Sequence, residues 1–467
     1  MKKRLLKIAK IVGICFAVIL VLFVVLIGPW PTYSAHYAGK PYYEETLQRI
    51  DTGTGGIHIS SDPGKLTAGY AKADITPPVG TPLAGYGHRR GAPSTSVLDR
   101  LYVKALALSD GQDTVVVVGS DMLLVHEDMV KAIYPRVLEA VDIPRHCILF
   151  NASHTHSGPG AWGKGIGEKI TGGDYDQKIF DMIVEGFSNV IIESVNNKHP
   201  ASLGLGVVEC PAYIRNRVVK SGKIDPWLSY MFIELADTGE TLVYANYSAH
   251  PTTLSGMEIS ADFPGFVQKY LEANGAVFAL YQSGGVGSMG PRTPKPGGYE
   301  GVRAMGEGLA KKILEQRPKT KLSNRVEIAA IGCEVMLPPF QVRLPLWFPH
   351  LRLSPILTSL VTDRDGYLQA ALVDNTIFMG APADLGGEID LVLKDYVREK
   401  GYTGVTFSFC GDYVGYIVPD ERYMLYEYET SLMSMNGPYM GSYFTELMER
   451  MVDRIDSRKR AEAGGTA

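Results

Sequence analysis

The stretch Ile11–Trp30 contains no charged residue, and it limits what the chain can fold into more than any other feature. Twenty helical residues at about 1.5 Å each span roughly 30 Å, the thickness of the apolar core of a bilayer. By the positive-inside rule, the basic residues before this stretch keep residues 1–10 in the cytoplasm; they are Lys2, Lys3, Arg4, Lys7 and Lys10. The sequence therefore predicts a single-pass membrane protein whose body lies outside the cytoplasm, in the periplasm or at the cell surface.

A cleaved signal peptide is the alternative interpretation of this stretch. Its apolar core usually has about 7–15 residues and ends at a small-residue cleavage site. Here the run is longer and Pro29-Trp30-Pro31 follows it, with Trp30 and Tyr33 where an interfacial aromatic belt would lie. We therefore expect a retained anchor over 11–30 and a linker over 31–66. One folded domain over 67–458 and a flexible tail over 459–467 would follow.

Charge and cysteine usage exclude several classes of protein. Residues 44–467 carry a net charge of −10, so the body would repel phosphate, and we expect no nucleic-acid partner. The cysteines are scattered and form no C-x-x-C pair, which argues against a zinc finger or a thioredoxin-type motif. Four of them could pair outside the cytoplasm, although buried small apolar side chains are the favoured interpretation; they are Cys147, Cys210, Cys333 and Cys410.

Strand and helix patterns alternate through the rest of the chain. Strands are expected at residues 103–108, 114–118, 147–150, 242–247, 276–281, 325–336 and 369–379. Helices are expected at residues 127–140, 176–194, 302–316, 385–400 and 442–457. Such alternation predicts the α/β class, with a large mixed β-sheet covered by helices.

Two histidine-bearing segments follow predicted strands. The segment Asn151–Gly160 contains His154 and His156, and the segment Asn246–Thr253 contains His250. Sheets gather ligands at the carboxyl ends of their strands, so a shared site is plausible. Ordinary loop histidines are the alternative for the His154/His156 pair.

Two further polar segments have the same kind of position. The segment Gly380–Glu388 offers Asp384, which could instead be only the N-cap of the following helix. The segment Asp412–Tyr416 begins a tyrosine-rich stretch, a type of sequence that more often forms a wall or core. The residues alone leave these alternatives open.

The ordered motifs between Thr67 and Tyr443 resemble those of the neutral/alkaline non-lysosomal ceramidase family, N-terminal catalytic domain. The most specific is His154-Thr-His156-Ser-Gly-Pro, and the others are Ala68–Pro78, Ala84-Gly-Tyr-Gly87, Asn216-Arg217, His250 with Ser260-x-Asp262, Tyr416–Tyr423 and Tyr428-Glu429. The sequence shows no counterpart of the family's C-terminal β-rich domain.

The resemblance implies a zinc amidohydrolase that splits the N-acyl bond of ceramide, with one ion held by two histidines, a glutamate and a tyrosine. Carried over by position, His154, His250 and Tyr416 would be ligands. His156 and Arg217 would polarise the substrate or transfer protons, and Tyr428 would line the site. A lipid or another N-acyl small molecule would be the substrate.

Two positions depart from the family's pattern. The family's Gly-Glu step, which carries the ligand glutamate, is matched here to Gly380-Ala381, so Asp384 becomes the nearest carboxylate and Glu388 the second. The family's serine motif is matched to Gly287–Arg292, which puts Gly290 at the serine and Ser288 at the preceding aspartate. A serine nucleophile is therefore not expected.

These observations favour a membrane-anchored, metal-dependent amide hydrolase. A ceramidase-like domain that has lost catalysis and binds a lipid or glycan is one alternative, and a metal-dependent esterase is another. The apolar run Leu344–Leu360 could face the bilayer and admit a lipid, although packing in the interior is the more common role of such a run.

Overall fold

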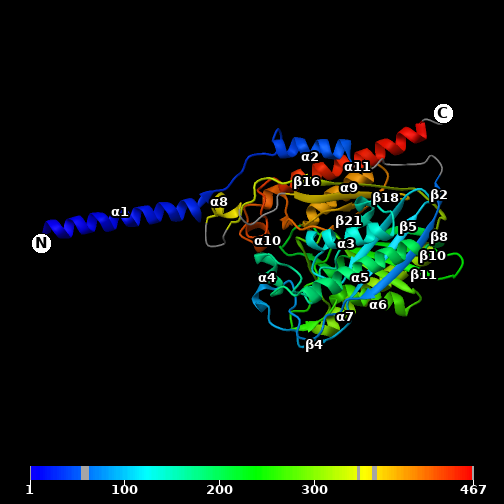
Figure 1. Ribbon diagram of the computed structural model, residues 1–467. Coiled ribbons are helices and arrows are strands. Elements are labelled where there is room, and N and C mark those ends of the chain that lie inside the picture. Colours follow the sequence, from blue (N-terminus) through cyan, green and yellow to red (C-terminus); the bar gives the residue numbers. More distant parts are fainter. Residues whose placement is uncertain (1, 54–62, 344–347, 360–364, 465–467) are drawn as a thin grey trace.

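The computed structural model describes residues 2–53, 63–343, 348–359 and 365–464 (Figure 1). They form a mixed α/β fold with a large mixed sheet, surrounding helices and one apolar N-terminal helix, so the predicted fold class is confirmed. The predicted domain boundaries stay a prediction.

The larger sheet has eight strands in the order β13-β11-β10-β8-β3-β5-β6-β7. Its pairs are antiparallel except β11–β13 and β6–β7, which are parallel. Val115–Val118 in β6 are fully buried, as expected for a strand covered on both faces. The strands are β3 (Thr67–Asp74), β5 (Tyr102–Ser109), β6 (Thr114–Ser120), β7 (Ile148–Leu149), β8 (His199–Glu209), β10 (Trp227–Leu235), β11 (Thr241–Tyr247) and β13 (Phe278–Ser283).

This sheet curls until its two ends meet, and that closure creates the candidate site. The side chain of Gln282 in β13 donates to the carbonyls of Val118 in β6 (2.9 Å) and Leu149 in β7 (3.2 Å). Gly119 allows the approach, because a Cβ there would lie 2.5 Å from the carbonyl oxygen of Tyr281. The loops that follow β7 and β11 are thereby brought together.

A second sheet of four strands, in the order β16-β18-β19-β21, lies beside the first. Asn151 joins the two sheets, because its amide donates to the carbonyls of Ser283 (3.1 Å), the last residue of β13, and Ser408 (2.6 Å), the residue after β21. The strands are β16 (Ile328–Met336), β18 (Asp365–Val373), β19 (Thr376–Gly380) and β21 (Thr403–Phe407).

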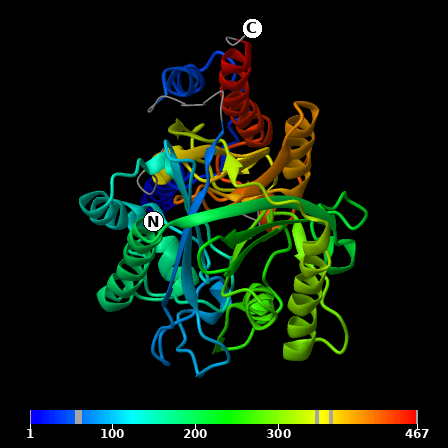
Figure 2. The ribbon, with the colours of Figure 1, turned by 90° about the vertical axis from the view of Figure 1, so that its right-hand side faces the viewer.

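Helices cover both sheets, as Figures 1 and 2 show. In α5, Ile183, Phe187, Val190 and Ile191 are buried, which is the spacing of one helix face against the sheet. On the larger sheet lie α3 (Glu127–Ala140), α5 (Gln177–Asn196), α6 (Asp262–Ala273) and α7 (Gly298–Leu314). On the second sheet lie α2 (Pro41–Thr52), α9 (Gly387–Glu399) and α11 (Met440–Gly464), with α2 and α11 side by side in both views.

Short elements complete the fold. The two-residue and three-residue strands pair as β1–β17, β2–β15, β4–β12, β9–β14 and β20–β22. Their bounds are β1 (Trp30–Pro31), β2 (Gly64–Lys65), β4 (Ser96–Val97), β9 (Ile214–Asn216), β12 (Glu258–Ile259), β14 (Met289–Pro291), β15 (Arg325–Val326), β17 (Leu351–Arg352), β20 (Asp384–Leu385) and β22 (Tyr416–Ile417). The short helices are α4 (Ile166–Gly172), α8 (Pro355–Thr358) and α10 (Tyr428–Ser431).

The N-terminal helix α1 (Lys2–Leu26) projects away from the body (Figure 1). Residues Lys3–Leu26 are long and apolar enough to cross a membrane, because an 18-residue window within them has a mean hydropathy of 3.0, and none of that window is buried in the protein. A signal sequence passes the same test. The predicted linker after this helix is not an open chain up to Thr52, because it contains β1 and α2.

Most of the predicted elements exist, with some different boundaries. The hairpin of β5 and β6 turns at Asp110-Gly111 as predicted, with Gly111 in the left-handed region (φ 97°). The strand predicted at 369–379 is two strands, because Asp374 (φ 56°) turns the chain between β18 and β19. The four cysteines of the body are buried and free, as favoured. Helix α11 continues to Gly464, into the predicted tail.

Candidate metal centre

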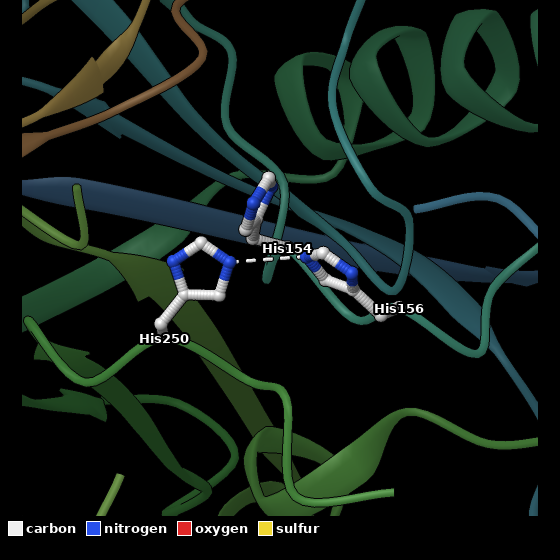
Figure 3. A group of neighbouring side chains, drawn as sticks. All are labelled: His154, His156 and His250. Carbon is white, nitrogen blue, oxygen red and sulfur yellow. Dashed lines mark hydrogen bonds between the residues drawn. The ribbon is translucent and has the colours of Figure 1, made fainter. Parts of the chain in front are cut away.

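The two histidine segments follow strands on opposite sides of the curled sheet: β7 is one end strand, and β11 lies next to the other, β13. His154 follows β7, and His250 follows β11. Both side chains are buried, and their ring centroids lie 4.5 Å apart. His156 joins them, and ligand atoms of the three rings lie within 4.8 Å of one another (Figure 3). The structure therefore brings together three histidines that are far apart in the sequence.

His154 is held in an uncommon backbone conformation. Its φ is 64°, in the left-handed region that non-glycine residues seldom adopt. The ring of Phe409 stacks on the imidazole at 4.2 Å with an interplanar angle of 9°. The Nδ1–H donates to the carbonyl of Leu123 (2.5 Å). Backbone strain maintained by surrounding contacts is a frequent property of functional sites.

The hydrogen bond to Leu123 also decides what the other ring nitrogen can do. A carbonyl only accepts, so Nδ1 carries the proton, and in the neutral ring Nε2 has a bare lone pair. That Nε2 lies 3.2 Å from Oδ1 of Asp384, a buried oxygen with no hydrogen-bond partner among the described residues. Two lone pairs that face each other in a buried place need a proton or a metal ion between them. The donor set therefore fits a metal ion.

His250 is held in a related but different way. Its Nδ1 lies 3.2 Å from the carbonyl of Val286 and 3.8 Å from Asp384 Oδ1, and its Nε2 is turned to His156. That Nε2 lies 3.0 Å from Nε2 of His156. Burial first, and then the charge of Arg217, lowers the pKa of His250 well below its usual value. Burial and the neighbouring His154 similarly lower the pKa of His156. Neutral imidazole is the form that binds a metal.

Asp384 lies in the short strand β20 and not at a helix N-cap, so the N-cap interpretation is wrong. The residue before α9 is Gly386, and Asp384 pairs in parallel with Tyr416 of β22. The hydroxyl of Tyr413 donates to Asp384 Oδ2 (2.8 Å), which leaves Oδ1 for the histidines. Ala381 stands at the position matched to the family's ligand glutamate. Its main-chain N–H donates to the carbonyl of Phe407 (2.9 Å), which holds the backbone there in place.

Arg217 and Tyr416 lie beside the histidines. Arg217 Nη2 donates to the hydroxyl of Tyr416 (3.1 Å) and to the carbonyl of Gly287 (2.9 Å). Its Nε forms an ion pair with Glu429 (3.1 Å). Burial alone would lower the pKa of Arg217, but Tyr416, Glu429 and Asp384 raise it overall. The guanidinium is thus a permanent, oriented cation at the edge of the site.

Tyr428 forms the outer part of the same wall. Its ring lies edge-on to Tyr416 with the centroids 6.1 Å apart, and 52 % of the residue is exposed. Burial raises the pKa of Tyr416 well above its usual value, and Asp384 adds to the effect. The site therefore runs from buried imidazoles to an aromatic rim that is open to solvent.

Glu388, the second carboxylate considered from the sequence, points elsewhere. It accepts hydrogen bonds from Ser288 and from the amide of Asn216 (2.7 Å for the latter). Gly290, at the matched serine position, lies against Arg217, because a Cβ there would be 3.2 Å from the Arg217 Cβ. The described structure thus places Asp384, and not Glu388, against the histidines.

Several contributors were not assigned a role from the sequence. Glu429 was noted only as part of a motif and Tyr413 only as part of the segment Asp412–Tyr416, whereas Phe409 and the Leu123 carbonyl had no signal in the sequence. The Ala84–Gly87 motif gains a physical explanation: a Cβ on Gly85 would lie 2.6 Å from His156 Nδ1, so only glycine admits that ring. Phe409 and the Leu123 carbonyl take part only through contacts with His154, which is distant in the sequence, so no local pattern indicates them.

The fold and these side chains define a candidate metal centre of the histidine–carboxylate class. Residues 66–227 match the family model for the neutral/alkaline non-lysosomal ceramidase, N-terminal. The structure is similar to that of neutral ceramidase from Pseudomonas aeruginosa, with a TM-score of 0.72 and 19 % identity over 85 % of this chain and 75 % of that one. A ceramidase complexed with C2 matches with a TM-score of 0.71 and 18 % identity, over 84 % and 76 % of the two chains.

These comparisons confirm the resemblance to the ceramidase N-terminal domain that the motifs indicated. At such identities the solved structures establish the fold alone. No curated protein sequence matches the chain. The roles of individual residues therefore rest on the geometry described above.

Proposed function

We propose that the protein is a membrane-anchored, metal-dependent hydrolase that cleaves the amide bond of an N-acyl lipid, ceramide or a related molecule. The observation that carries the proposal is the buried cluster of His154, His156 and His250, with Asp384 Oδ1 3.2 Å from His154 Nε2 and 3.8 Å from His250 Nδ1. Tyr416 would complete the ligand set, since it is the ladder partner of Asp384. Zinc suits a set of two imidazoles, a carboxylate and a phenol oxygen.

A zinc ion at such a site supplies Lewis-acid polarisation and makes water a usable nucleophile near neutral pH. The chain would supply the remaining chemistry. Arg217 is held by Glu429 and the Gly287 carbonyl so that it can stabilise negative charge on the oxygen of the scissile carbonyl. Its preset orientation means that little reorganisation is needed when the charge develops.

His156 would move the proton. Its Nδ1 is buried and has no hydrogen-bond partner within the described ranges, and its Nε2 faces His250. A neutral imidazole beside the site can accept a proton from water and return it to the leaving amine. Tyr86 packs on the ring with the centroids 4.6 Å apart, which keeps it in place. Tyr428 would contact the substrate at the rim.

The anchor is part of the proposal. We infer that α1 spans the membrane with its basic end in the cytoplasm, which leaves the body outside. The apolar helix and the five preceding basic residues support this orientation. N-terminal sequencing of the mature protein tests whether the anchor is retained, because a mature chain that begins beyond Tyr33 would show a cleaved signal sequence.

A panel of N-acyl lipids and their matched O-acyl esters tests the reaction. The full chain in detergent should release fatty acid from at least one amide, and a chelator should abolish the release until zinc is restored. Hydrolysis of esters alone would support an esterase. Binding without hydrolysis, in a chain that holds no stoichiometric metal, would support the catalytically degenerate alternative that Ala381 suggests.

A further inference from the structure

The end of α1 is bonded to the body and is not joined to it by a flexible tether. Ser354 caps this end: its hydroxyl donates to the carbonyl of Val25 (2.6 Å) and its N–H to that of Ile27 (2.9 Å). The indole N–H of Trp30 donates to the carbonyl of Val24 (2.7 Å). The last carbonyls of a helix need such partners, so these contacts fix the position of α1 where it would leave the membrane.

The attachment continues along the next residues. Trp30 and Pro31 pair with Arg352 and Leu351 as the ladder β1–β17, and the Arg352 guanidinium donates to the Pro31 carbonyl (2.9 Å). The main chain of Tyr33 exchanges two hydrogen bonds with the side chain of Gln341 (2.8 and 2.9 Å).

Helix α2 then secures the segment to the second sheet. Its Ile50 is fully buried, and the hydroxyl of Thr46 accepts from the N–H of Met336 in β16 (3.0 Å). Arg450 of α11 forms an ion pair with Asp51 (2.6 Å). From Val24 to Thr52 the chain therefore has anchoring contacts at short intervals.

The same contacts lead inward to the candidate site. We define the clamp as residues 338–343 and 348–356. Within it, the Leu353 N–H donates to the Val342 carbonyl (2.9 Å), and the buried Arg343 donates to the carbonyls of Tyr423 and Thr430. Thr430 is the neighbour of Glu429, the ion-pair partner of Arg217. A continuous series of bonds thus joins the end of α1 to the wall of the site.

The clamp also carries exposed apolar side chains near the end of α1. Phe348 is 74 % exposed and Ile356 is 46 % exposed. In Figure 1, α8, which contains Ile356, lies at the body end of α1, and α10, which begins at Tyr428, lies on the same side of the body. Leu344–Trp347 and Leu360 of the predicted apolar run lie outside the described residues. An apolar surface at the exit of a membrane-spanning helix is placed to meet lipid.

We propose that the clamp rests on the bilayer that α1 spans and holds the site at a fixed height above that membrane, so that the enzyme takes substrate from its own bilayer. The proposal rests on the proposed function for the anchor and the lipid substrate. A rigid attachment presents the aromatic rim to the lipids of one membrane without the entropy loss that a flexible tether would incur.

A fluorescence measurement tests the contact without using activity. The full chain with Cys15→Ser is placed in liposomes, and Phe348→Cys is labelled with an environment-sensitive dye. Thr238→Cys, in the exposed turn between β10 and β11 at the other end of the body, is the matched control. The dye at 348 should shift to the blue and be quenched by brominated acyl chains, whereas the dye at 238 should behave as in water.

A second measurement tests the rigid attachment. A flexible Gly/Ser insertion of about twelve residues after Gly28, combined with Ser354→Ala, should lower hydrolysis of lipid in the same liposome about tenfold. Hydrolysis of a short-chain N-acyl substrate in detergent should stay unchanged, which also shows that the variant is folded. The same insertion after Thr238 is the control.

A dye at 348 that reports water in the parent chain, or an unchanged liposome rate in the freed variant, would overturn the proposal. A parent chain that hydrolyses no N-acyl lipid in either medium would refute the proposed function instead. The fluorescence result would still decide whether the clamp contacts the bilayer.

Discussion

The two walls of the candidate site differ in what they contribute. The wall built on the eight-stranded sheet supplies the imidazoles of His154, His156 and His250 and the cation of Arg217. The wall beside the four-stranded sheet supplies the carboxylates of Asp384 and Glu429 and the hydroxyl of Tyr416. A dication needs both neutral donors and negative charge, so neither wall is sufficient alone.

The walls also differ in how their side chains are held. His154 and His250 are oriented by the main-chain carbonyls of Leu123 and Val286, which follow β6 and β13, the strands paired with β7 and β11. Asp384 depends on a two-residue ladder with Tyr416 and on the hydroxyl of Tyr413. We therefore expect that losses from the first wall are larger, and that the second wall tolerates conservative exchange.

The largest effect is expected from the first wall. His154→Ala and His250→Ala should each remove most bound zinc and activity, because the remaining ligands hold the ion poorly. Metal analysis of the purified variants measures this. His199→Ala, which removes a partly exposed histidine paired with Asp237, is the control and should keep the parent's zinc content. Full zinc in both site variants would show that the ligand assignment is wrong.

The second effect separates catalysis from metal binding. Arg217→Ala should lower kcat about 100-fold, as loss of a preset donor to a developing oxyanion does, and leave the zinc content unchanged. Arg215→Ala, two residues away and exposed, should change neither quantity. Steady-state kinetics with parallel metal analysis decide the matter. Equal losses in the two arginine variants would argue against a specific role for Arg217.

The third effect tests the second wall. Asp384→Asn keeps the size of the side chain but removes the anion, so zinc affinity should fall at least about tenfold. Asp384→Glu should be intermediate, since it restores the charge at a different reach. Competition with a zinc chelator gives the affinities. An Asp384→Asn variant that binds zinc like the parent would remove this carboxylate from the site.

The smallest effect is expected for Glu388→Gln. Glu388 is engaged with Ser288 and Asn216, and a glutamine can still accept from Asn216 at its oxygen and donate its amide N–H to the Ser288 hydroxyl. Zinc affinity should change less than in Asp384→Asn. Loss of zinc in Glu388→Gln, with normal binding in Asp384→Asn, would mean that the other carboxylate completes the site.

The sequence was sufficient for the parts of the fold and site that local patterns encode. The Asp110-Gly111 hairpin, the alternation of strands and helices and the polar segments after strands follow from neighbouring residues, and the structure contains them. The family model matches residues 66–227, the region that contains several of the motifs named from the sequence. The roles assigned to the site residues stay predictions.

What the sequence did not indicate depends on contacts between distant residues. The closure of the sheet relies on Gln282 in β13 reaching carbonyls of β6 and β7, and no local pattern specifies that partner. The choice between Asp384 and Glu388 depends on Ser288 and Asn216, which lie about 100 and 172 positions from Glu388. The sequence of the predicted linker did not indicate that α2 packs on the second sheet. Only Thr46 and Ile50 of that helix are fully buried, so its sequence lacks a broad apolar face.

The zinc content of the full chain, purified without added metal, tests the central claim most directly. We predict one zinc ion per chain, removed by a chelator together with N-acyl lipid hydrolysis and restored with it. Hydrolysis that continues in metal-free protein would contradict a metal-dependent mechanism. A chain with neither stoichiometric metal nor hydrolysis would contradict the enzyme assignment itself.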